Sequence, residues 1–265
     1  MGNLSMMNKF KILGLCGSEL PIIFKQYAGG EYDVVLDYEN AAMWDFEVAA
    51  TIEAHIRNGD IMMLALVVDA VRELLGDINL ILHLPYLPYA RQDRTTEPGQ
   101  AFSLKVFTKL LNTLPVDTVV INDCHSDVGI ALVDKVLNIP WQMPEFVPVV
   151  DALIAPDFGA TKKVQKAAKE FKIEQVIQAG KMRNVKTGEL SGPVIFGNVC
   201  GKDVLVMDDI CDGGRTFLQL ATALKEAGAN NLYLHVTHGI FSYGAKEKLR
   251  EAGYEVTATY DWTEK

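Results

Sequence analysis

The segment VLVMDDICDGGRT, residues 204–216, decides the fold of this chain. Its first four residues are apolar and predict a buried strand that runs directly into Asp208 and Asp209. A glycine pair follows, where backbone N–H groups can approach an anion, and the helical pattern that comes next adds the positive end of a helix. Paired carboxylates suit the diol of a ribose, or a magnesium ion bound through water. The segment therefore predicts a strand, a turn and a helix that together bind a sugar phosphate.

The same alternation of strands and helices extends to both sides of this segment. Apolar patterns predict strands at residues 80–86, 118–123 and 231–238, and helices at residues 101–114, 161–172 and 216–228. We therefore predict the α/β fold class, with two doubly wound parallel-sheet domains. The proline-rich segment 138–150 lies between the two halves and gives domains at residues 1–143 and 144–265. Ligands of such sheets bind at the carboxyl ends of the strands, where several charged clusters of this chain fall.

Composition narrows the class of protein further. The chain has 265 residues, is 49% hydrophobic and carries a formal net charge of −9, which argues against a nucleic-acid partner held by bulk charge. Its four cysteines form no CxxC motif, a pattern typical of a reducing compartment. The N-terminus lacks the pattern of a signal peptide, and the longest apolar run, residues 61–68, is too short to span a bilayer. We expect a soluble cytoplasmic protein without membrane association.

Residues 204–216 resemble the ribose-phosphate signature of the type I phosphoribosyltransferase fold. That resemblance leaves open the transferases that consume phosphoribosyl diphosphate (PRPP) and the synthetase that makes it. The segment LPYLPYARQDRTTEPGQAFSLK, residues 84–105, resembles the ATP-binding segment of PRPP synthetases, the ribose-phosphate diphosphokinases. In that family the arginine, glutamine and aspartate of this run contact ATP, which implies ATP-binding roles for Arg91, Gln92 and Asp93. Charge alone would instead favour a solvated loop after a strand.

Two further segments resemble the metal-binding parts of the same family. INDCHSD, residues 121–127, resembles the strand end that carries a magnesium-associated histidine, here His125. APDFGATKK, residues 155–163, resembles a loop that binds metal and diphosphate, with Asp157 as the matching acid. Phe158 and Ala160 depart from the histidine and glycine that are usual in this loop, so we expect it to be reshaped.

The segment AGKMRNVKTGEL, residues 179–190, stands where the family has a mobile catalytic loop with a lysine and an arginine two residues apart. Lys181 and Arg183 have that spacing, and the resemblance implies that they stabilise charge on the transferred diphosphoryl group. Taken without the other segments, this stretch would be interpreted as a surface hairpin. QYAGGE, residues 26–31, keeps only Glu31 of an FxDGE-like segment that reaches the ATP of a neighbouring subunit.

The resemblance implies a phosphoribosyltransferase-type fold and an ATP-dependent diphosphokinase. The β,γ-diphosphoryl group of ATP would pass to the anomeric hydroxyl of ribose 5-phosphate, giving PRPP and AMP, with Mg²⁺ as cofactor. It implies a homo-oligomer of two or more chains, without the family's hexamer being carried over. The ribose-phosphate site would comprise Asp208, Asp209, Asp212, Gly213, Gly214, Arg215 and Thr216.

Three alternatives remain open from the sequence. Gly213 replaces a threonine that is usual in the family's phosphate loop, and Arg215 adds a cation, so the same transfer to ADP-ribose is the first alternative. A PRPP-consuming transferase is the second, although such an enzyme has no ATP-binding segment. An inactive regulatory subunit is the third, although it would have lost cations and metal ligands that are present here.

Overall fold

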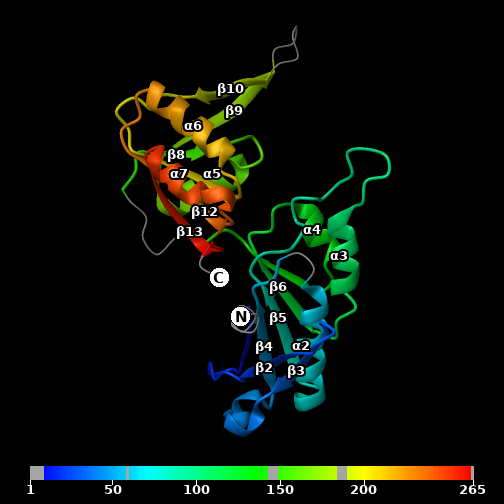
Figure 1. The fold of residues 1–265 in the computed structure, drawn as a ribbon. Helices are drawn as coiled ribbons and strands as arrows, with labels where there is room; N and C mark the ends of the chain where they lie inside the picture. Colours follow the sequence, from blue (N-terminus) through cyan, green and yellow to red (C-terminus); the bar gives the residue numbers. More distant parts are fainter. Residues whose placement is uncertain (1–8, 58–59, 143–148, 184–189, 264–265) are drawn as a thin grey trace. The chain divides into compact units, whose positions relative to one another are not determined.

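The computed structural model describes residues 9–57, 60–142, 149–183 and 190–263. The side chains of residues 181–183, 190 and 191 are not among those described. The chain divides into two compact units, one ending at Pro140 and the other beginning at Trp141 (Figure 1). The boundary expected after residue 143 falls in a stretch, residues 143–148, that lies outside the described residues.

The first unit is built on a five-stranded sheet of order β1-β4-β5-β6-β7. Strands β4 to β7 are parallel to their neighbours, and β1 pairs antiparallel with β4 at the edge. The elements, in chain order, are β1 (Phe10–Leu13), β2 (Ile22–Gln26), β3 (Tyr32–Leu36), the short 3-10 helices η1 (Tyr38–Asn40) and η2 (Met43–Phe46), β4 (Ala49–Ala54), α2 (Ile61–Leu75), β5 (Asn79–Leu84), α3 (Ser103–Leu111), β6 (Thr118–Asn122), α4 (Asp127–Leu132) and β7 (Val136–Ile139).

The helices of this unit share one face of its sheet. Each crossover from β4 to β7 moves to the next strand in the same direction, and right-handed crossovers then place α2, α3 and α4 on the same side (Figure 1). A single core results, in which Ile52 and Leu82 of the sheet pack with Val67 of α2 and Leu104 of α3. The hairpin of β2 and β3 adds its apolar side chains to this core, packed against α2.

The second unit is built on a six-stranded sheet of order β10-β9-β8-β11-β12-β13. Its strands are parallel to their neighbours, apart from β10, which pairs antiparallel with β9. The elements, in chain order, are β8 (Ala152–Ala155), α5 (Thr161–Phe171), β9 (Gln175–Arg183), β10 (Leu190–Phe196), β11 (Val204–Cys211), α6 (Arg215–Glu226), β12 (Leu232–Gly239), the 3-10 helix η3 (Ser242–Gly244), α7 (Ala245–Glu251) and β13 (Tyr254–Asp261).

The strand order of the second unit reverses between β8 and β11. The chain passes from β8 to β9 in one direction, and from β11 through β12 to β13 in the other. Right-handed crossovers therefore place α5 on one face and α6 and α7 on the opposite face. Two separate cores confirm this, one with Val164 of α5 and the other with Leu220 of α6 and Leu249 of α7. The point of reversal is where open α/β sheets bind ligands at their carboxyl edge.

At the amino edge of each sheet, an aspartate that precedes a central strand accepts hydrogen bonds that join neighbouring strands. Asp117, before β6, accepts hydrogen bonds from the backbone N–H of Leu80 at 2.8 Å and from the Arg72 guanidinium at 2.7 Å. Asp203, before β11, accepts bonds from the backbone N–H of Asn231 at 3.1 Å and from the Asn230 amide at 2.6 Å. These bonds hold the pKa of both carboxyls below the usual range, so each stays charged and joins the starts of neighbouring strands.

The predicted α/β class with parallel sheets is confirmed, as are the strands at residues 80–86, 118–123 and 231–238 to within a few residues. The segment 179–190 differs from the expected loop, because β9 continues through Arg183 and β10 begins at Leu190. None of the four cysteines, all of which are among the described residues, forms a disulfide. Within the described residues, no helix combines the length and the apolar character that crossing a bilayer requires.

Candidate functional site

The clusters predicted from the sequence, except for the segment that contains Glu31, lie at the carboxyl edges of the two sheets. In the second unit, two loops flank the point where the strand order reverses. The first follows β8 and contains Asp157, and the second follows β11 and contains the two glycines at 213 and 214. In the first unit, the loop after β5 contains Arg91, and the loop after β6 contains His125. Each unit is therefore described separately below.

Asp208 and Asp209 are the last acids of β11 before the turn. Asp208 is half-buried and Asp209 is 7% exposed, and the Asp209 backbone N–H donates to the Asp208 carboxylate at 2.9 Å. Burial raises the pKa of Asp208 well above its usual range, and the adjacent Asp209 carboxylate raises it further. Two adjacent carboxylates repel each other when both are charged. A ligand that donates a hydrogen bond to each of them would stabilise both charges. A ribose diol is such a ligand.

Helix α6 begins without a side chain that caps it. Its N-cap is Gly214, whose φ of 72° is left-handed and therefore favours glycine. A Cβ at this residue would also lie 3.2 Å from the Ala245 Cβ, a tight contact. Thr216 is exposed within the first turn and does not cap the helix. The first N–H groups of α6 are therefore available to an anion.

The loop after β8 is shaped by Asp157. Its carboxylate Oδ1 accepts a hydrogen bond from the Ala160 backbone N–H at 3.0 Å, while the side chain stays exposed. A Cβ at Gly159 would lie 3.1 Å from the same oxygen. Helix α5 follows directly, and its third residue, Lys163, is close enough to Asp208 to lower the pKa of that acid, opposing the effect of burial. The two loops therefore converge at the point of strand reversal.

Lys181 and Arg183 lie near the end of β9, in an antiparallel ribbon with β10. Lys181 is in register with Pro193, and Arg183 with Leu190. The ribbon has the backbone of a hairpin as far as Arg183, and the residues between the two strands lie outside the described part of the chain. The side chains of both residues are likewise not described, so their catalytic roles stay predictions.

In the first unit, the run YARQDR forms a tight turn after β5. Tyr89 has a φ of 63°, which is uncommon for a residue with a side chain and marks a constrained backbone. The Tyr89 carbonyl accepts a hydrogen bond from the Gln92 backbone N–H at 2.8 Å. Arg91 and Gln92 have exposed side chains, as residues that contact a ligand require.

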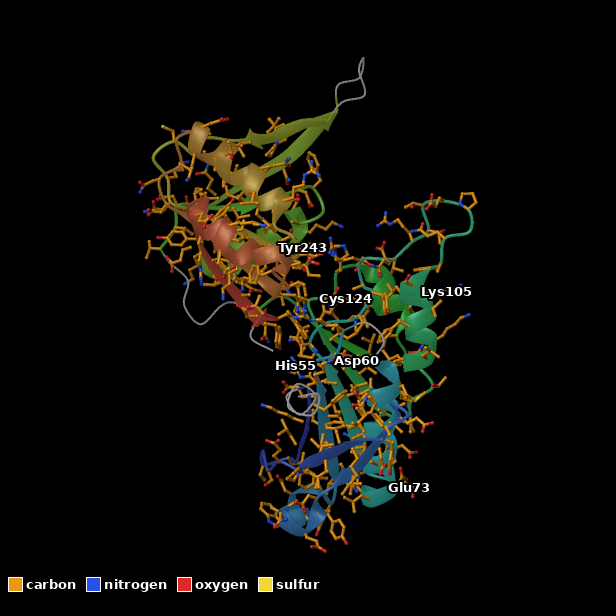
Figure 2. All side chains as sticks on the ribbon, viewed as in Figure 1. His55, Asp60, Glu73, Lys105, Cys124 and Tyr243 are labelled. Carbon is orange, nitrogen blue, oxygen red and sulfur yellow. The ribbon has the colours of Figure 1, made fainter. Side chains whose placement is uncertain are left out.

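Asp93 differs from its two neighbours, because it is 7% exposed. Its carboxylate accepts hydrogen bonds from the Arg94 guanidinium at 2.8 and 3.3 Å. Arg94 holds the pKa of Asp93 below its usual range, and Ser126 and His125 act in the same direction. The structure therefore brings the predicted ATP-binding segment and the predicted metal-associated histidine together in one cluster. Cys124, the residue before His125, marks the start of this loop in Figure 2.

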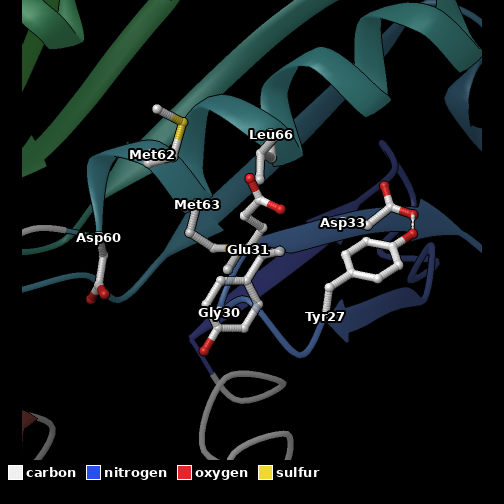
Figure 3. Close-up of a pocket in the computed structure, with 9 residues that line it drawn as sticks. Tyr27, Gly30, Glu31, Asp33, Asp60, Met62, Met63 and Leu66 are labelled. Atoms are coloured by element: carbon white, nitrogen blue, oxygen red, sulfur yellow. Dashed lines mark hydrogen bonds between the residues drawn. The ribbon is translucent and has the colours of Figure 1, made fainter.

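Glu31 lies in the turn between β2 and β3, away from β5 and β6. The Tyr27 backbone N–H donates to the Glu31 carbonyl at 2.8 Å, and Gly30, with a φ of 91°, completes the turn. The turn borders a cavity of about 790 Å³ beneath the start of α2 (Figure 3). Its lining includes the carboxylates of Asp33 and Asp60, so this is an acidic and partly aromatic pocket.

The predicted magnesium ligands can be tested against the oxygen atoms that the structure offers. Mg²⁺ prefers oxygen ligands and keeps several waters, and it is usually held by one or two carboxylates and substrate phosphates. Asp157 is exposed and has one carboxylate oxygen not engaged by Ala160, which fits this pattern. Among the described residues, no group of three or more His, Cys, Asp or Glu side chains is placed to hold a metal ion. The residues present fit a magnesium ion bound mainly through substrate phosphates.

Sequence reasoning missed two cations of this site. Lys163 ends the segment APDFGATKK but receives no role of its own from the sequence, because its approach to Asp208 depends on how α5 packs beside β11. The sequence assigns no role to Arg94, although it is the partner of Asp93. An arginine directly after an aspartate in a tight turn is a local signal that could have identified this pair.

Two family models match this chain. Residues 20–114 match the N-terminal domain of ribose phosphate pyrophosphokinase, and residues 159–260 match the phosphoribosyl synthetase-associated domain. The ribose-phosphate pyrophosphokinase of Corynebacterium efficiens is 29% identical over 253 residues, which cover 91% of this chain and 76% of that protein. The enzyme of the same name from Saccharolobus solfataricus is 32% identical over 199 residues, which cover 72% of this chain and 67% of that protein.

A solved structure shares the fold. The phosphoribosylpyrophosphate synthetase from Mycobacterium smegmatis superposes with a TM-score of 0.72 at 22% sequence identity. The superposition covers 92% of this chain and 88% of that one. Both units therefore have counterparts in a known phosphoribosyltransferase-type architecture.

Proposed function

The chain belongs to the ribose-phosphate pyrophosphokinase family, and we propose that it transfers the β,γ-diphosphoryl group of ATP to the anomeric hydroxyl of ribose 5-phosphate, giving PRPP and AMP. One observation supports the acceptor most directly. Asp208 and Asp209 stand beside a helix start that has no side-chain cap, so hydroxyl and phosphate sites occur on the same turn.

The acceptor is held by the loop after β11. Asp208 and Asp209 accept hydrogen bonds from the 2- and 3-hydroxyls, which relieves the repulsion between the two carboxylates. The first N–H groups of α6 and the Thr216 hydroxyl bind the 5-phosphate. Asp212 and Gly213 shape the turn, and Arg215 supplies a cation at its rim. The anomeric oxygen is thereby fixed in position for attack.

The nucleotide is held by exposed side chains of the first unit. The Arg91 guanidinium donates two hydrogen bonds to a phosphate or stacks on the adenine, and the Gln92 amide hydrogen-bonds to the edge of the base. The buried Asp93 keeps this turn in place through Arg94. Glu31, on the separate β2–β3 turn, contributes to the nucleotide site of a neighbouring subunit.

The transfer forms a bond from the anomeric oxygen to the β-phosphorus and breaks the bond from that phosphorus to the bridging oxygen, which leaves with AMP. The hydroxyl proton passes to water. Lys181 and Arg183 stabilise the charge that develops on the transferred group. Asp157 in one unit and His125 in the other are each proposed to serve a magnesium ion bound with ATP, which would supply positive charge against the phosphates.

The test is a phosphorus NMR assay with ATP, Mg²⁺ and ribose 5-phosphate. We expect AMP together with a new anomeric diphosphate signal. The same products from ADP-ribose, with none from ribose 5-phosphate, would keep the diphosphoryl transfer and refute the acceptor. If neither acceptor yields AMP, the diphosphokinase proposal is refuted, and a transferase or a regulatory subunit becomes the better interpretation.

A further inference from the structure

Three polar side chains cross the carboxyl end of the first sheet, on the face opposite the helices. They are Glu53 of β4, His83 of β5 and Asn122 of β6, and we call them the polar row. Glu53 is in register with His83, and His83 with Val120, which precedes Asn122 by two residues and shares its face. Residues that alternate with them, such as Leu82, belong to the core shared with α2 and α3. The polar row is therefore not part of the packing that holds the helices to the sheet.

Interactions between side chains connect the polar row. The His83 Nε2 and the Asn122 Oδ1 are 2.6 Å apart, so His83 donates a hydrogen bond from Nε2 to the amide oxygen. Asn122 is only 6% exposed. At the other end, the hydrogen bond with the buried His55 lowers the pKa of Glu53, and His83 acts in the same direction. His83 thus links the carboxylate of β4 to the amide of β6.

The backbone turns sharply at Asp123, directly after the polar row. The φ of Asp123 is 46°, in the left-handed region that residues with a side chain seldom adopt. The Asp123 N–H donates to the Ile139 carbonyl at 2.7 Å, and the Cys124 N–H donates to the Asn138 side chain at 3.1 Å. Ile139 is in register with Asn122, so Asn138 lies on the opposite face. The turn is therefore held from both faces of the sheet, by Asn138 on one and by the polar row on the other.

This turn sets the direction of the loop that carries His125. His125 follows Asp123 by two residues, has an exposed side chain, and lowers the pKa of Asp93 in the predicted ATP-binding segment. Left-handed residues with a side chain persist where their surroundings determine them, and they cluster at functional sites. A change in the turn would therefore move His125 relative to the segment that contains Arg91.

We propose that His83 is a positioning residue of the nucleotide site. Its Nε2–H holds the Asn122 amide at the end of β6, and the turn that follows holds His125 beside the predicted ATP-binding segment. An apolar side chain could fill the same space on the sheet, but it would not supply the directional bond that fixes the start of the loop. This inference rests on the proposed function, because it assigns His83 to the site of the donor nucleotide.

The experiment compares variants of His83 that carry a donor at different places. The amide nitrogen of glutamine can take the place of Nε2, whereas that of asparagine reaches only the place of Nδ1. His83→Gln should therefore keep kcat/KM for ATP within about 2-fold of the wild type. His83→Asn and His83→Ala should lower it by roughly 10-fold, within the range for groups that orient a metal-associated histidine. The KM for ribose 5-phosphate, which we propose binds to the second unit, should change less than about 2-fold in all three.

Two measurements without turnover report on the position of His125 itself. In NMR spectra of the five histidine rings, the His125 signals, assigned with His125→Gln, should shift in His83→Asn and stay in place in His83→Gln. Calorimetry with ADP and Mg²⁺ should rank the affinities of the variants in the same order. Ile81→Ala, which removes a half-buried side chain two residues earlier on the same face of β5, is the matched control. It should lower Tm without moving the His125 signals.

A double-mutant cycle tests whether His83 acts through Asn122. Asn122→Leu should lower kcat/KM for ATP as His83→Ala does, and combining the two changes should cost little more than either alone. Additive losses would show that His83 acts by another route. Equal losses for ATP and ribose 5-phosphate, or equal behaviour of the glutamine and asparagine variants, would make His83 a structural residue and overturn the inference. Because NMR and calorimetry need no turnover, failure of the diphosphokinase assay remains distinguishable from failure of this inference.

Discussion

Asp93 in the first unit and Asp208 in the second are acids of the same type at the carboxyl edge of a parallel sheet, yet their surroundings differ. Asp93 accepts two bonds from Arg94, which lowers its pKa. Asp208 is next to another carboxylate, and burial raises its pKa. Asp93 has a positively charged partner, Arg94, within the folded chain, and this pair stabilises a turn. Asp208 contributes little to the stability of the fold, because its charge is buried beside a second carboxylate. We propose that it serves to bind a ligand.

The largest effect should come from Lys181 of the second unit, which we propose acts only on the reacting ligand. Lys181→Ala should lower kcat by about 10²- to 10³-fold, since it removes one group that stabilises transferred charge. The KM for ribose 5-phosphate should change far less. Steady-state kinetics, with the exposed Lys169→Ala on α5 as control, test this. Equal losses in kcat and in acceptor affinity would remove Lys181 from the catalytic role.

Asp208→Asn should separate function from stability. The asparagine keeps an oxygen for the Asp209 N–H but removes a charge that is costly to bury, so we expect Tm to rise by ~2–4 °C. The KM for the acceptor should rise by roughly 10-fold or more, since a hydrogen bond from a sugar hydroxyl to a charged group is weakened. Calorimetry and kinetics on the same preparation measure both. A lower Tm would show that Asp208 stabilises the fold after all.

Asp93→Asn should change Tm in the opposite direction to Asp208→Asn. It weakens the charge-assisted bonds from Arg94 in a place where the acid is buried, so Tm should fall by ~2–4 °C. The matched change at Asp127, an exposed acid that begins α4, should leave Tm within about a degree. A rise in Tm for Asp93→Asn would contradict the comparison between the two acids.

The smallest effect is a difference in pH dependence. Because the folded pKa of Asp208 lies above the unfolded value of about 3.9, its contribution to stability is lost as the pH rises from that value through the folded pKa. The pKa of Asp93 is lowered, so its contribution is present above about pH 3.9 and is lost as the pH falls through the folded pKa. Urea unfolding should show Asp208→Asn gaining on the wild type between pH 4 and 7. A constant difference over that range would refute the raised pKa.

Much of the fold could be predicted because strong local patterns specify it. The strand that begins at Val204 and the helix that begins at Arg215 follow from apolar periodicity and a glycine turn. The strand character of the β9–β10 ribbon could not be predicted from apolar periodicity, because AGKMR is polar and glycine-containing. It becomes a strand only through its pairing with β10. Which acids gain a partner also depends on packing, as Lys163 beside Asp208 shows.

Asp117 and Asp203, which join the starts of neighbouring strands through hydrogen bonds, lie at the ends of the sheets opposite to the loops proposed to bind substrates. The residues that hold the starts of the strands together are therefore different from those that we propose select the substrate. We therefore expect point mutations in the loops after β8 and β11, which we propose bind the acceptor and the diphosphate, to alter which acceptor is used without loosening the starts of the strands. A lineage that carries this scaffold can acquire new substrates by small steps, each of them made in a protein that still folds.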